Sequence, residues 1–547
     1  MIQRVVIRGF KRFGDVEFNL PGHVVLAGPN NAGKTTFLQA ISAWSLTFER
    51  WKQLNDFQRH GGSYSKAPIA RQAFSAVPLA AFDHLWRERN YRGQIIEIQV
   101  RTGEWEITME LISDSTEQIY VRPKSGVIPE VVRSAKLQTV FVPAMTGLST
   151  EEPVYQKPKL DQLMGQARPG EVLRNLLVEA NQLEEAWKHL SESIWKLFGF
   201  TLLPPDATGA HIVSEYLVRE GGPRLDIASG GSGFQQVLML LTFLHTRPGA
   251  VLLLDEPDAH LHMILQDAIY GELRSEAMRQ RSQLVIATHS EVIINSVEPR
   301  ELCAMLDRPR PLADTKERDR LILSLGVLTN ADILQSLEVP GILYVEHYTD
   351  LDILRAWAKV LQHPISDFLA AKVFWKPTVA DTRTGAPGIK AKDHYNALLL
   401  VRGDLPGLEL VDRDAHEGIQ STEITGHGFQ RLRWRRYEVE SYLVHPEALA
   451  RYVRIQVGSE ASQHVEDLRH HFEENYPPAF LRDPLTDNAV LLRSKARTEL
   501  LPPALTAAGL PGLPYTRYSE IAAVMLPEEI HPEVREKLDL IQKALGL

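Results

Sequence analysis

The stretch VVLAGPNNAGKTTFLQAI, Val24–Ile41, decides the fold of the first part of this chain. Four apolar residues predict a buried strand, a loop bounded by Gly28 and Gly33 follows, and Lys34 begins a predicted helix. The spacing Gly28-x-x-x-x-Gly33-Lys34-Thr35 is that of a phosphate-binding loop, in which backbone N–H groups point at phosphate oxygens and the helix dipole adds positive potential. We therefore expect a nucleotide site formed by Asn30, Asn31, Ala32, Gly33, Lys34, Thr35 and Thr36.

A second apolar stretch, AVLLLDEPDAHLH, supplies an acidic partner for this loop. Asp255 ends the predicted strand, where we expect it to hold Mg²⁺ through its water shell, with the Thr35 hydroxyl as a direct ligand. Glu256 is then placed to polarise the attacking water. The next apolar strand, LVIATHS, ends on His289, which is a third catalytic candidate because of its order along the chain.

Between the loop and the acidic strand, LDIASGGSGFQQVLMLL predicts a helix that starts with serine and glycine. The order of these motifs resembles the ABC-type ATPase head of the SMC, RecF and OLD groups. In that family the serine-glycine element of one subunit closes on the ATP of another, so the resemblance implies a homodimer with two composite ATP sites. Two alignments are open: Ser232–Gln235 matches the family's SGGQ, and Ser229–Gly231 matches its first three letters. We favour Ser232 and Gly233.

The bulk composition is that of a cytoplasmic protein. The chain has 547 residues, a net charge of −9 and one cysteine, Cys303, which excludes an intrachain disulfide. The first residues, MIQRVVIRGF, lack the apolar core of a signal peptide. The longest apolar run, Val237–Leu244, is too short to span a membrane, so no membrane partner is expected.

We expect an α/β fold with several domains. The ATPase is assigned to residues 1–168 and 206–338, with a helical insertion at 169–205. The helical stretch Glu171–Phe200 is interpreted either as a helix packed on the ATPase sheet or as a dimerisation element, as OLD-type proteins have. Because no heptad pattern is sustained, long coiled-coil arms are not expected.

Residues 339–547 carry a second set of acids at predicted strand ends, in YVEHYTD, LVDRDAHEG and YEVESYL. Parallel strands bring their carboxyl ends to one edge of a sheet, so these acids should meet. Clustered carboxylates repel each other unless cations are bound, and such oxygen ligands select Mg²⁺ or Mn²⁺. Two ions can clamp a phosphodiester. We expect Glu346, Asp412 and Asp414 to anchor the metals, Asp350 and Glu440 to complete a second ion, and Glu346 and Asp412 to act in catalysis.

This acidic set resembles a TOPRIM domain, and with the ATPase it resembles the OLD-family endonucleases, which include the nuclease subunit of Gabija-type anti-phage systems. The resemblance implies an ATP-regulated, metal-dependent endonuclease acting on DNA, or on RNA, in anti-phage defence, with a partner protein or non-coding RNA. His347 departs from the family, which has glycine there. By order along the chain, Lys495 is the candidate for the lysine that OLD nucleases place near the scissile phosphate.

Two other functions compete with a nuclease. One is an ATPase sensor or scaffold whose inactive TOPRIM domain holds a partner effector, which His347 and the acidic net charge favour. The other is a RecF-type repair ATPase with a DNA-binding appendage, which the clustered acids disfavour. The basic stretch RLRWRR, Arg431–Arg436, is interpreted either as arginine stems covering apolar surface or as a phosphate-contacting patch.

Overall fold

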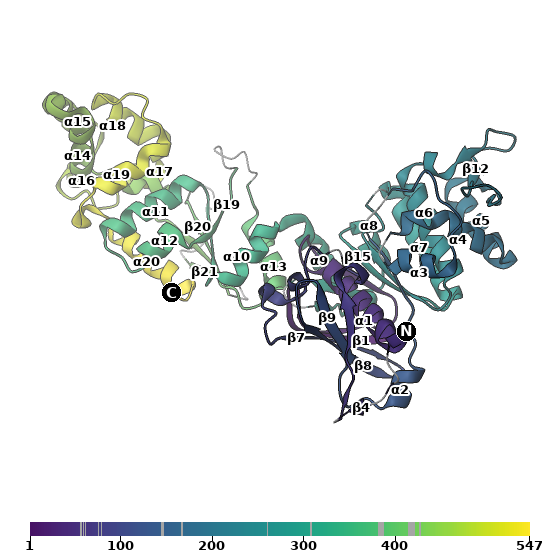
Figure 1. Ribbon diagram of the computed structural model, residues 1–547. Coiled ribbons are helices and arrows are strands. Elements are labelled where there is room, and N and C mark those ends of the chain that lie inside the picture. The colour runs from purple at the N-terminus through teal and green to yellow at the C-terminus, as the bar shows by residue number, and fades with distance from the viewer. Residues whose placement is uncertain are drawn as a thin grey trace. The chain divides into compact units, whose positions relative to one another are not determined.

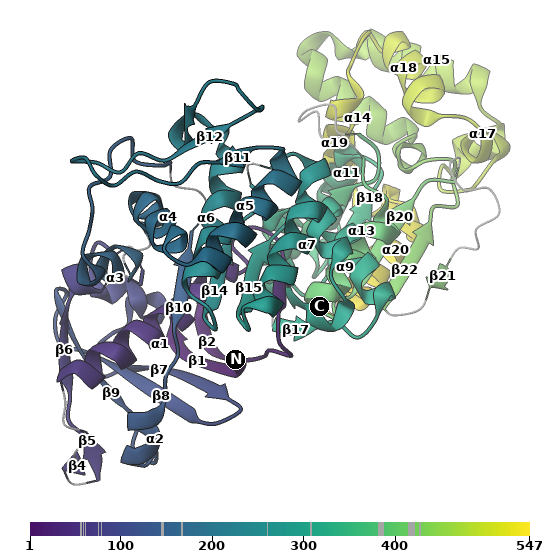
Figure 2. The same cartoon turned by 90° about the vertical axis from the view of Figure 1, so that its right-hand side faces the viewer.

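The computed structural model describes residues 1–547 except 55–56, 58, 61, 75, 78, 144–146, 166–167, 260, 307–308, 381–387, 414–421 and 426–427. The described chain divides into two compact units, Met1–Leu325 and Gly326–Leu547 (Figures 1 and 2). Helix α10 (Asn330–Glu338) lies within the segment 206–338 that was assigned to the ATPase, but it belongs to the second unit. None of the helices in the described ranges combines the length and apolar character needed to cross a bilayer.

The first unit is built around a mainly parallel sheet with the strand order β10-β14-β15-β3-β16-β17. Its strands are β10 (Thr139–Val142), β14 (Val251–Asp255), β15 (Gln283–Thr288), β3 (Val24–Ala27), β16 (Leu302–Met305) and β17 (Pro309–Pro311). Only β17 pairs antiparallel. Every residue of β3, β14 and β15 is buried, which explains their continuous apolar sequences. The parallel pairing brings the carboxyl ends of these three strands together.

A second, antiparallel sheet in the same unit has the order β2-β1-β7-β8-β9-β6. Its strands are β1 (Ile2–Phe10), β2 (Phe13–Asn19), β6 (Ala67–Ala70), β7 (Ile95–Thr102), β8 (Glu106–Ser113) and β9 (Gln118–Pro123). Helix α1 (Lys34–Leu54) contacts strands of both sheets. Its Trp44 stacks on Trp105 with the ring centroids 5.4 Å apart and donates Nε1–H to the Ile107 carbonyl at 3.0 Å. The helix that begins at the phosphate-binding loop is thus held on two sides.

The predicted helical stretch Glu171–Phe200 forms two helices, α4 (Leu173–Asn181) and α5 (Glu184–Phe198). Both pack against α6 (Ser232–Thr246), and α5 also contacts α7 (Met263–Arg279), as Figure 2 shows. Trp195 of α5 is 65% exposed. The other elements of the unit are α2 (Pro129–Ser134), α3 (Lys157–Gly165), α8 (Glu291–Ser296), β4 (Arg59–His60), β5 (Ser63–Tyr64), β11 (Thr201–Leu202), β12 (Glu215–Leu217) and β13 (Leu225–Asp226). Helix α9 (Thr315–Val327) includes the boundary between the two units, after Leu325.

The second unit contains a sheet with the order β19-β18-β20-β22-β21. Its strands are β18 (Ile342–Val345), β19 (Phe374–Pro377), β20 (Gly407–Val411), β21 (Thr422–Thr425) and β22 (Phe429–Arg433), and only β21 pairs antiparallel. Besides α10, its helices are α11 (Tyr348–Val360), α12 (Ser366–Ala371), α13 (Ala391–Val401), α14 (Pro446–Val457), α15 (Ala461–Asn475), α16 (Pro478–Arg482), α17 (Ala489–Arg493), α18 (Leu501–Ala507), α19 (Tyr518–Val524) and α20 (Pro532–Ala544). Figure 1 shows α14 to α19 gathered into one helical group.

The basic stretch Arg431–Arg436 lies at the end of β22 and packs into this unit. Trp434 is buried beside the ring of Tyr442. Arg436 is also buried, and its Nε donates to Asp487 at 2.9 Å. Arg431 and Arg435 form ion pairs with Glu409 and Glu536. These contacts favour a packing role for the stretch.

Candidate functional site

The phosphate-binding loop connects β3 to α1, and its backbone explains its glycines. Gly33 has a φ of 102° and Asn31 a φ of 62°, both in the left-handed region. A Cβ atom at Gly28 would lie 2.2 Å from the Met305 carbonyl oxygen of the neighbouring strand β16. Gly28 is therefore required for close packing, and Gly33 for the turn into the helix.

Lys34 and Thr35, at the start of α1, face the carbonyls of the loop and the acidic strand. Lys34 is 5% exposed, and its Nζ donates to the Gly28 and Pro29 carbonyls at 2.5 and 2.9 Å. Burial lowers the pKa of Lys34, while the carboxylates of Glu256 and Asp255 oppose this effect. The Thr35 hydroxyl lies 2.9 Å from both carboxylate oxygens of Asp255, although the two residues are 220 positions apart.

This contact is the geometry expected of a Mg²⁺-nucleotide site. Burial raises the pKa of the Asp255 carboxyl, and a divalent cation would relieve that cost by stabilising the charged form. Ala32 is buried in the loop, whereas Asn30 and Asn31 are exposed and Thr36 is half-buried in the first turn of α1. The fold thus brings the predicted loop and the predicted acid together.

Glu256 and His289 lie beside each other at the ends of β14 and β15. His289 Nδ1 lies 3.2 Å from Glu256 Oε1, and the Glu256 backbone has a φ of 46°. The Glu256 N–H donates to the Ala287 carbonyl at 2.8 Å, which anchors this strained position to β15. Asp258, which sequence reasoning missed, is buried and accepts a 2.7 Å hydrogen bond from the Thr288 hydroxyl. The sequence signal for Asp258 was the third acid of the stretch DEPD, Asp255–Asp258.

The serine-glycine element lies at the start of α6. The helix begins at Ser232, so Ser232 and Gly233 occupy its first turn, while Ser229 ends the preceding 3-10 turn and Gly230 and Gly231 connect the two. Ser232 is exposed and Gly233 half-buried. The favoured alignment therefore has its serine at a helix N-terminus, where the dipole suits an anion. The choice between the alignments stays a prediction.

Buried polar side chains hold this element in shape. The Gln235 amide donates to the carbonyls of Ala228 and Gly230, both at 2.9 Å. Arg174, on α4, is 2% exposed and pairs with both carboxylate oxygens of Asp226 at 2.9 and 2.7 Å. Asp226 in turn accepts from the Ala228 N–H at 2.7 Å. Helix α4 of the predicted insertion is therefore connected directly to the serine-glycine turn.

In the second unit, the acids that follow β18 and β20 meet at one edge of the sheet. The backbone N–H of Asp412 donates to Glu346 Oε1 at 2.9 Å, and Asp412 Oδ1 accepts from the Val439 N–H at 2.9 Å. The second bond connects Asp412 to the segment Glu438–Glu440, called the ExE segment below. Oxygen atoms of Asp412, Glu438 and Glu440 all lie within 4.8 Å of one another, and the three residues are buried. Glu438 was not among the expected ligands, and Asp414 lies outside the described residues.

Asp350 lies in the first turn of α11, beside the same acids. Its Oδ2 accepts from the His347 N–H at 2.9 Å, and its Oδ1 accepts from the Thr349 hydroxyl at 3.3 Å. His347 is the N-cap of α11 with a φ of −128°, which is ordinary extended backbone. The position where the family has glycine therefore imposes no left-handed conformation in this chain.

The electrostatics of this cluster suit a hard divalent cation. Burial, reinforced by Asp350, Glu346 and Glu440, raises the pKa of Asp412 well above its usual range. Burial and then Glu440 likewise raise the pKa of Asp350. Oxygen-only ligands with this much mutual repulsion fit Mg²⁺ or Mn²⁺, which stabilises the ionised carboxylates.

The basic side chain of Arg497 lies within the acidic cluster. Its Nη2 is 2.6 Å from Glu440 Oε1 and 3.5 Å from Asp350 Oδ1. Burial opposes the guanidinium charge, but Glu440 and Asp350 outweigh it and raise the pKa of Arg497. The side chain of Lys495, our candidate by order along the chain, is exposed two residues earlier. In the stretch SKAR, Ser494–Arg497, the expected residue is the lysine, whereas the arginine is the one that contacts the acids.

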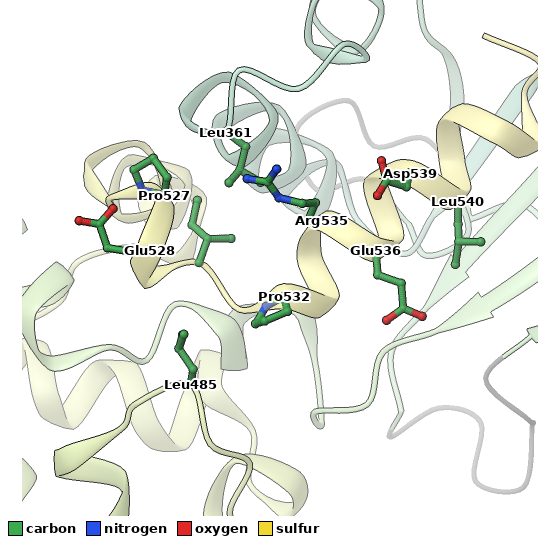
Figure 3. A pocket seen from close by; sticks show the side chains of 10 residues that line it. Leu361, Leu485, Pro527, Glu528, Pro532, Arg535, Glu536, Asp539 and Leu540 are labelled. Carbon is green, nitrogen blue, oxygen red and sulfur yellow. The ribbon is translucent and has the colours of Figure 1, made fainter.

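A separate cavity of about 580 Å³ lies beside α20 in the second unit (Figure 3). None of the five acids of the cluster, nor Arg497, lines it. The cavity is lined by Leu361, Leu485, Pro527, Glu528, Ile530, Pro532, Arg535, Glu536, Asp539 and Leu540.

Comparisons with known proteins concern mainly the first unit. Residues 4–197 match a family model described as "AAA domain", and residues 146–295 match one described as "AAA domain, putative AbiEii toxin, Type IV TA system". No curated protein sequence matches the chain.

Solved structures of SMC head domains are similar to this chain at low identity. The head from Pyrococcus furiosus, bound to the C-terminal domain of ScpA, is 12% identical, with a TM-score of 0.35 over 59% of this chain and 98% of that one. A head bound to the C-winged helix domain of ScpA is 15% identical, with a TM-score of 0.36 over 58% and 99%. The Thermotoga maritima head is 14% identical, with a TM-score of 0.31 over 57% and 99%.

The two family matches cover the phosphate-binding loop, Asp255, Glu256 and His289. They confirm the predicted nucleotide-binding ATPase in its general form. The chain therefore carries an AAA-type ATPase domain in its first unit.

Proposed function

We propose that this chain is an ATP-regulated, divalent-metal-dependent endonuclease of the OLD type, in which the first unit hydrolyses ATP and the second cleaves phosphodiester bonds. The observation that carries the proposal is the bond between the Asp412 N–H and the Glu346 carboxylate, 2.9 Å long. This bond joins the acids at the carboxyl ends of two adjacent parallel strands. In α/β proteins, active sites lie at this edge of the sheet.

The acidic residues fit the metal that such a reaction needs. Asp412, Glu438 and Glu440 would hold the ion, with Glu346 beside them. When bound, a divalent cation polarises the phosphoryl group and lowers the pKa of a bound water. The chain's own contribution is orientation, since the N–H groups of Asp412 and Val439 fix two of the carboxylates from the backbone.

The biological setting we propose is anti-phage defence, with DNA as the first substrate to test and RNA as the second. Support comes from the matching family model, whose description names a toxin of a toxin-antitoxin system. By resemblance, ATP closes two copies through Ser232 and Gly233 of one and the phosphate-binding loop of the other. A partner protein or non-coding RNA belongs to the same proposal.

Cleavage of supercoiled plasmid with Mg²⁺ or Mn²⁺, with and without ATP, tests this function. We expect nicked or linear product, abolished in Asp412→Asn and altered in its ATP dependence in Lys34→Ala. Asp404→Asn is the matched control, because Asp404 is an exposed acid of the same unit. Product of equal yield from Asp412→Asn would reject the acidic cluster as the catalytic site.

A second candidate function is an ATPase sensor or scaffold whose second unit holds a partner effector. Arg497 favours it, because this side chain already compensates the charge of Glu440 and Asp350 within the fold. A scaffold is expected to turn over ATP, to cleave neither DNA nor RNA, and to bind no divalent ion at Asp412. Metal binding measured beside cleavage separates the two functions.

A further inference from the structure

Arg497 differs from the acids of the cluster in the sign of its charge, and both its backbone and its side chain form hydrogen bonds with them. We propose that Arg497 serves as a built-in cation of the cluster, pairing with Glu440 and Asp350 so that the site holds one divalent ion instead of two. This inference rests on the proposed function and specifies it, since it replaces the two-ion site expected from the sequence.

The contacts of Arg497 account for the oxygens that a second ion would need. Its Nε and Nη2 lie 2.7 and 2.6 Å from Glu440 Oε1, and Nη2 lies 3.5 Å from Asp350 Oδ1. The other oxygen of Asp350 accepts the His347 N–H at 2.9 Å. Both oxygens of Asp350 are thus engaged by protein groups, and a metal ion would have to displace the guanidinium to reach them.

The rest of the cluster retains capacity for one ion. Glu440 is fully buried, and within the described part of the chain its Oε2 has no hydrogen-bond partner. A buried carboxylate oxygen left in this state is costly, and a bound cation removes the cost. The Glu440 carboxylate belongs to the same group as those of Asp412 and Glu438, with ligand atoms within 4.8 Å. The arginine therefore occupies one side of Glu440 and leaves the other side for a metal.

The position of Arg497 is fixed from both its backbone and its side chain. Its N–H donates to a Glu438 carboxylate oxygen, and its carbonyl accepts from the Tyr518 hydroxyl at 3.4 Å. Its guanidinium lies 5.2 Å from the centroid of the Tyr515 ring. Two backbone contacts and one side-chain contact thus hold Arg497 in place, which is what a permanent cation of the cluster requires.

Counting bound Mn²⁺ by electron paramagnetic resonance tests the proposal on the full-length protein. Every protein carries Thr35→Ala and is studied without nucleotide, so that the ion of the first unit is not counted. Three further variants are compared on this background: Arg497→Met, which removes the charge but keeps the stem, Arg497→Lys, which keeps a cation, and Asp412→Ala, which removes a ligand.

We expect one Mn²⁺ per chain with Arg497 and with Arg497→Lys, two with Arg497→Met, and none with Asp412→Ala. Two ions in the protein that retains Arg497 would overturn the inference while leaving a metal-dependent nuclease intact. The inference would also be overturned if the Arg497→Met variant folds and still binds a single Mn²⁺ with the affinity of the parent protein. No ion in any of these proteins would instead reject the metal site and the proposed function with it. If Arg497→Met does not fold, the count in the parent protein still decides between one ion and two.

Discussion

Replacing Lys376 by methionine tests how the second unit holds α10 against its sheet. Asp332, on α10, is 1% exposed, and Lys376 Nζ on β19 lies 2.5 Å from its Oδ1. His394 on α13 approaches the other oxygen at 3.4 Å, and the Thr329 N–H donates to it at 3.0 Å. The substitution leaves a buried carboxylate without its main cationic partner.

The expected cost follows from this burial. Breaking a buried ion pair by removing one partner costs about 3–5 kcal/mol. The Lys376 side chain remains 22% exposed, and His394 and Thr329 still contact the carboxylate, so we expect the lower end, about 3 kcal/mol. The double variant Asp332→Asn with Lys376→Met should recover part of the loss, because no buried charge then remains. The coupling energy of the cycle should be about 1–3 kcal/mol.

The pH dependence has a definite sign. Burial alone would raise the pKa of Asp332, but the close contacts with His394 and Lys376 and the hydrogen bond from the Thr329 N–H outweigh it and hold the pKa well below its usual range. The unfolded carboxyl titrates near pH ~4, so this stabilisation is complete above that value and is lost as the pH falls towards the folded pKa. The difference in stability between wild type and Asp332→Asn should therefore shrink below about pH 4.

Hydrogen exchange of the amides of β18 and β19 in the full-length protein measures the loss. A cost of 3 kcal/mol corresponds to roughly 10²-fold faster exchange of amides that open with the unit. Lys392→Met, at an exposed lysine of α13, is the control and should leave exchange unchanged. A coupling energy below about 0.5 kcal/mol would refute the reasoning, because it would mean that the pair acts as an exposed ion pair does.

Three further predictions concern both units. Glu256→Gln should lower ATP turnover by about 10²–10⁴-fold in a phosphate-release assay while fluorescent-nucleotide binding persists, and unchanged turnover would exclude Glu256 as the group that polarises water. Gly28→Ala, whose Cβ would meet the Met305 carbonyl at 2.2 Å, should weaken nucleotide binding at least about tenfold, whereas Gly271→Ala, with open space around it, should not. Burial lowers the pKa of His531 to about 4, so stability should fall by at most about 3 kcal/mol as the pH drops from about 6.5 to about 4, and His531→Gln should flatten that part of the unfolding profile.

The acids at the strand ends could be predicted from the sequence, because each lies at the end of a buried apolar strand. The strand patterns identify Asp255, Glu346 and Asp412 directly. Parallel pairing of β18 with β20 then brings the Asp412 N–H within 2.9 Å of Glu346 Oε1. The α/β character of the fold and the ATPase follow from the same patterns.

Other features depend on tertiary contacts that no local pattern encodes. Arg497 reaches the acids because a short helical turn, Ala496–Leu500, packs beside the ExE segment, and nothing in SKAR distinguishes its arginine from its lysine. The contacts of α4 and α5 with α6, and the pairing of Arg174 with Asp226, are likewise tertiary contacts between residues far apart in the sequence.

The central position of β3 in its sheet has a consequence for synthesis of the chain. Its two neighbours, β15 and β16, lie more than 200 residues later, as does Asp255, the partner of Thr35. At about 5–20 residues per second, a ribosome needs on the order of 10–40 s to add the 220 positions between Thr35 and Asp255. During that time both edges of an apolar strand lack their partners, which is a hazard for aggregation. In the nascent chain, β3 therefore gains both neighbouring strands, and Thr35 its partner Asp255, only after more than 200 further residues have been added.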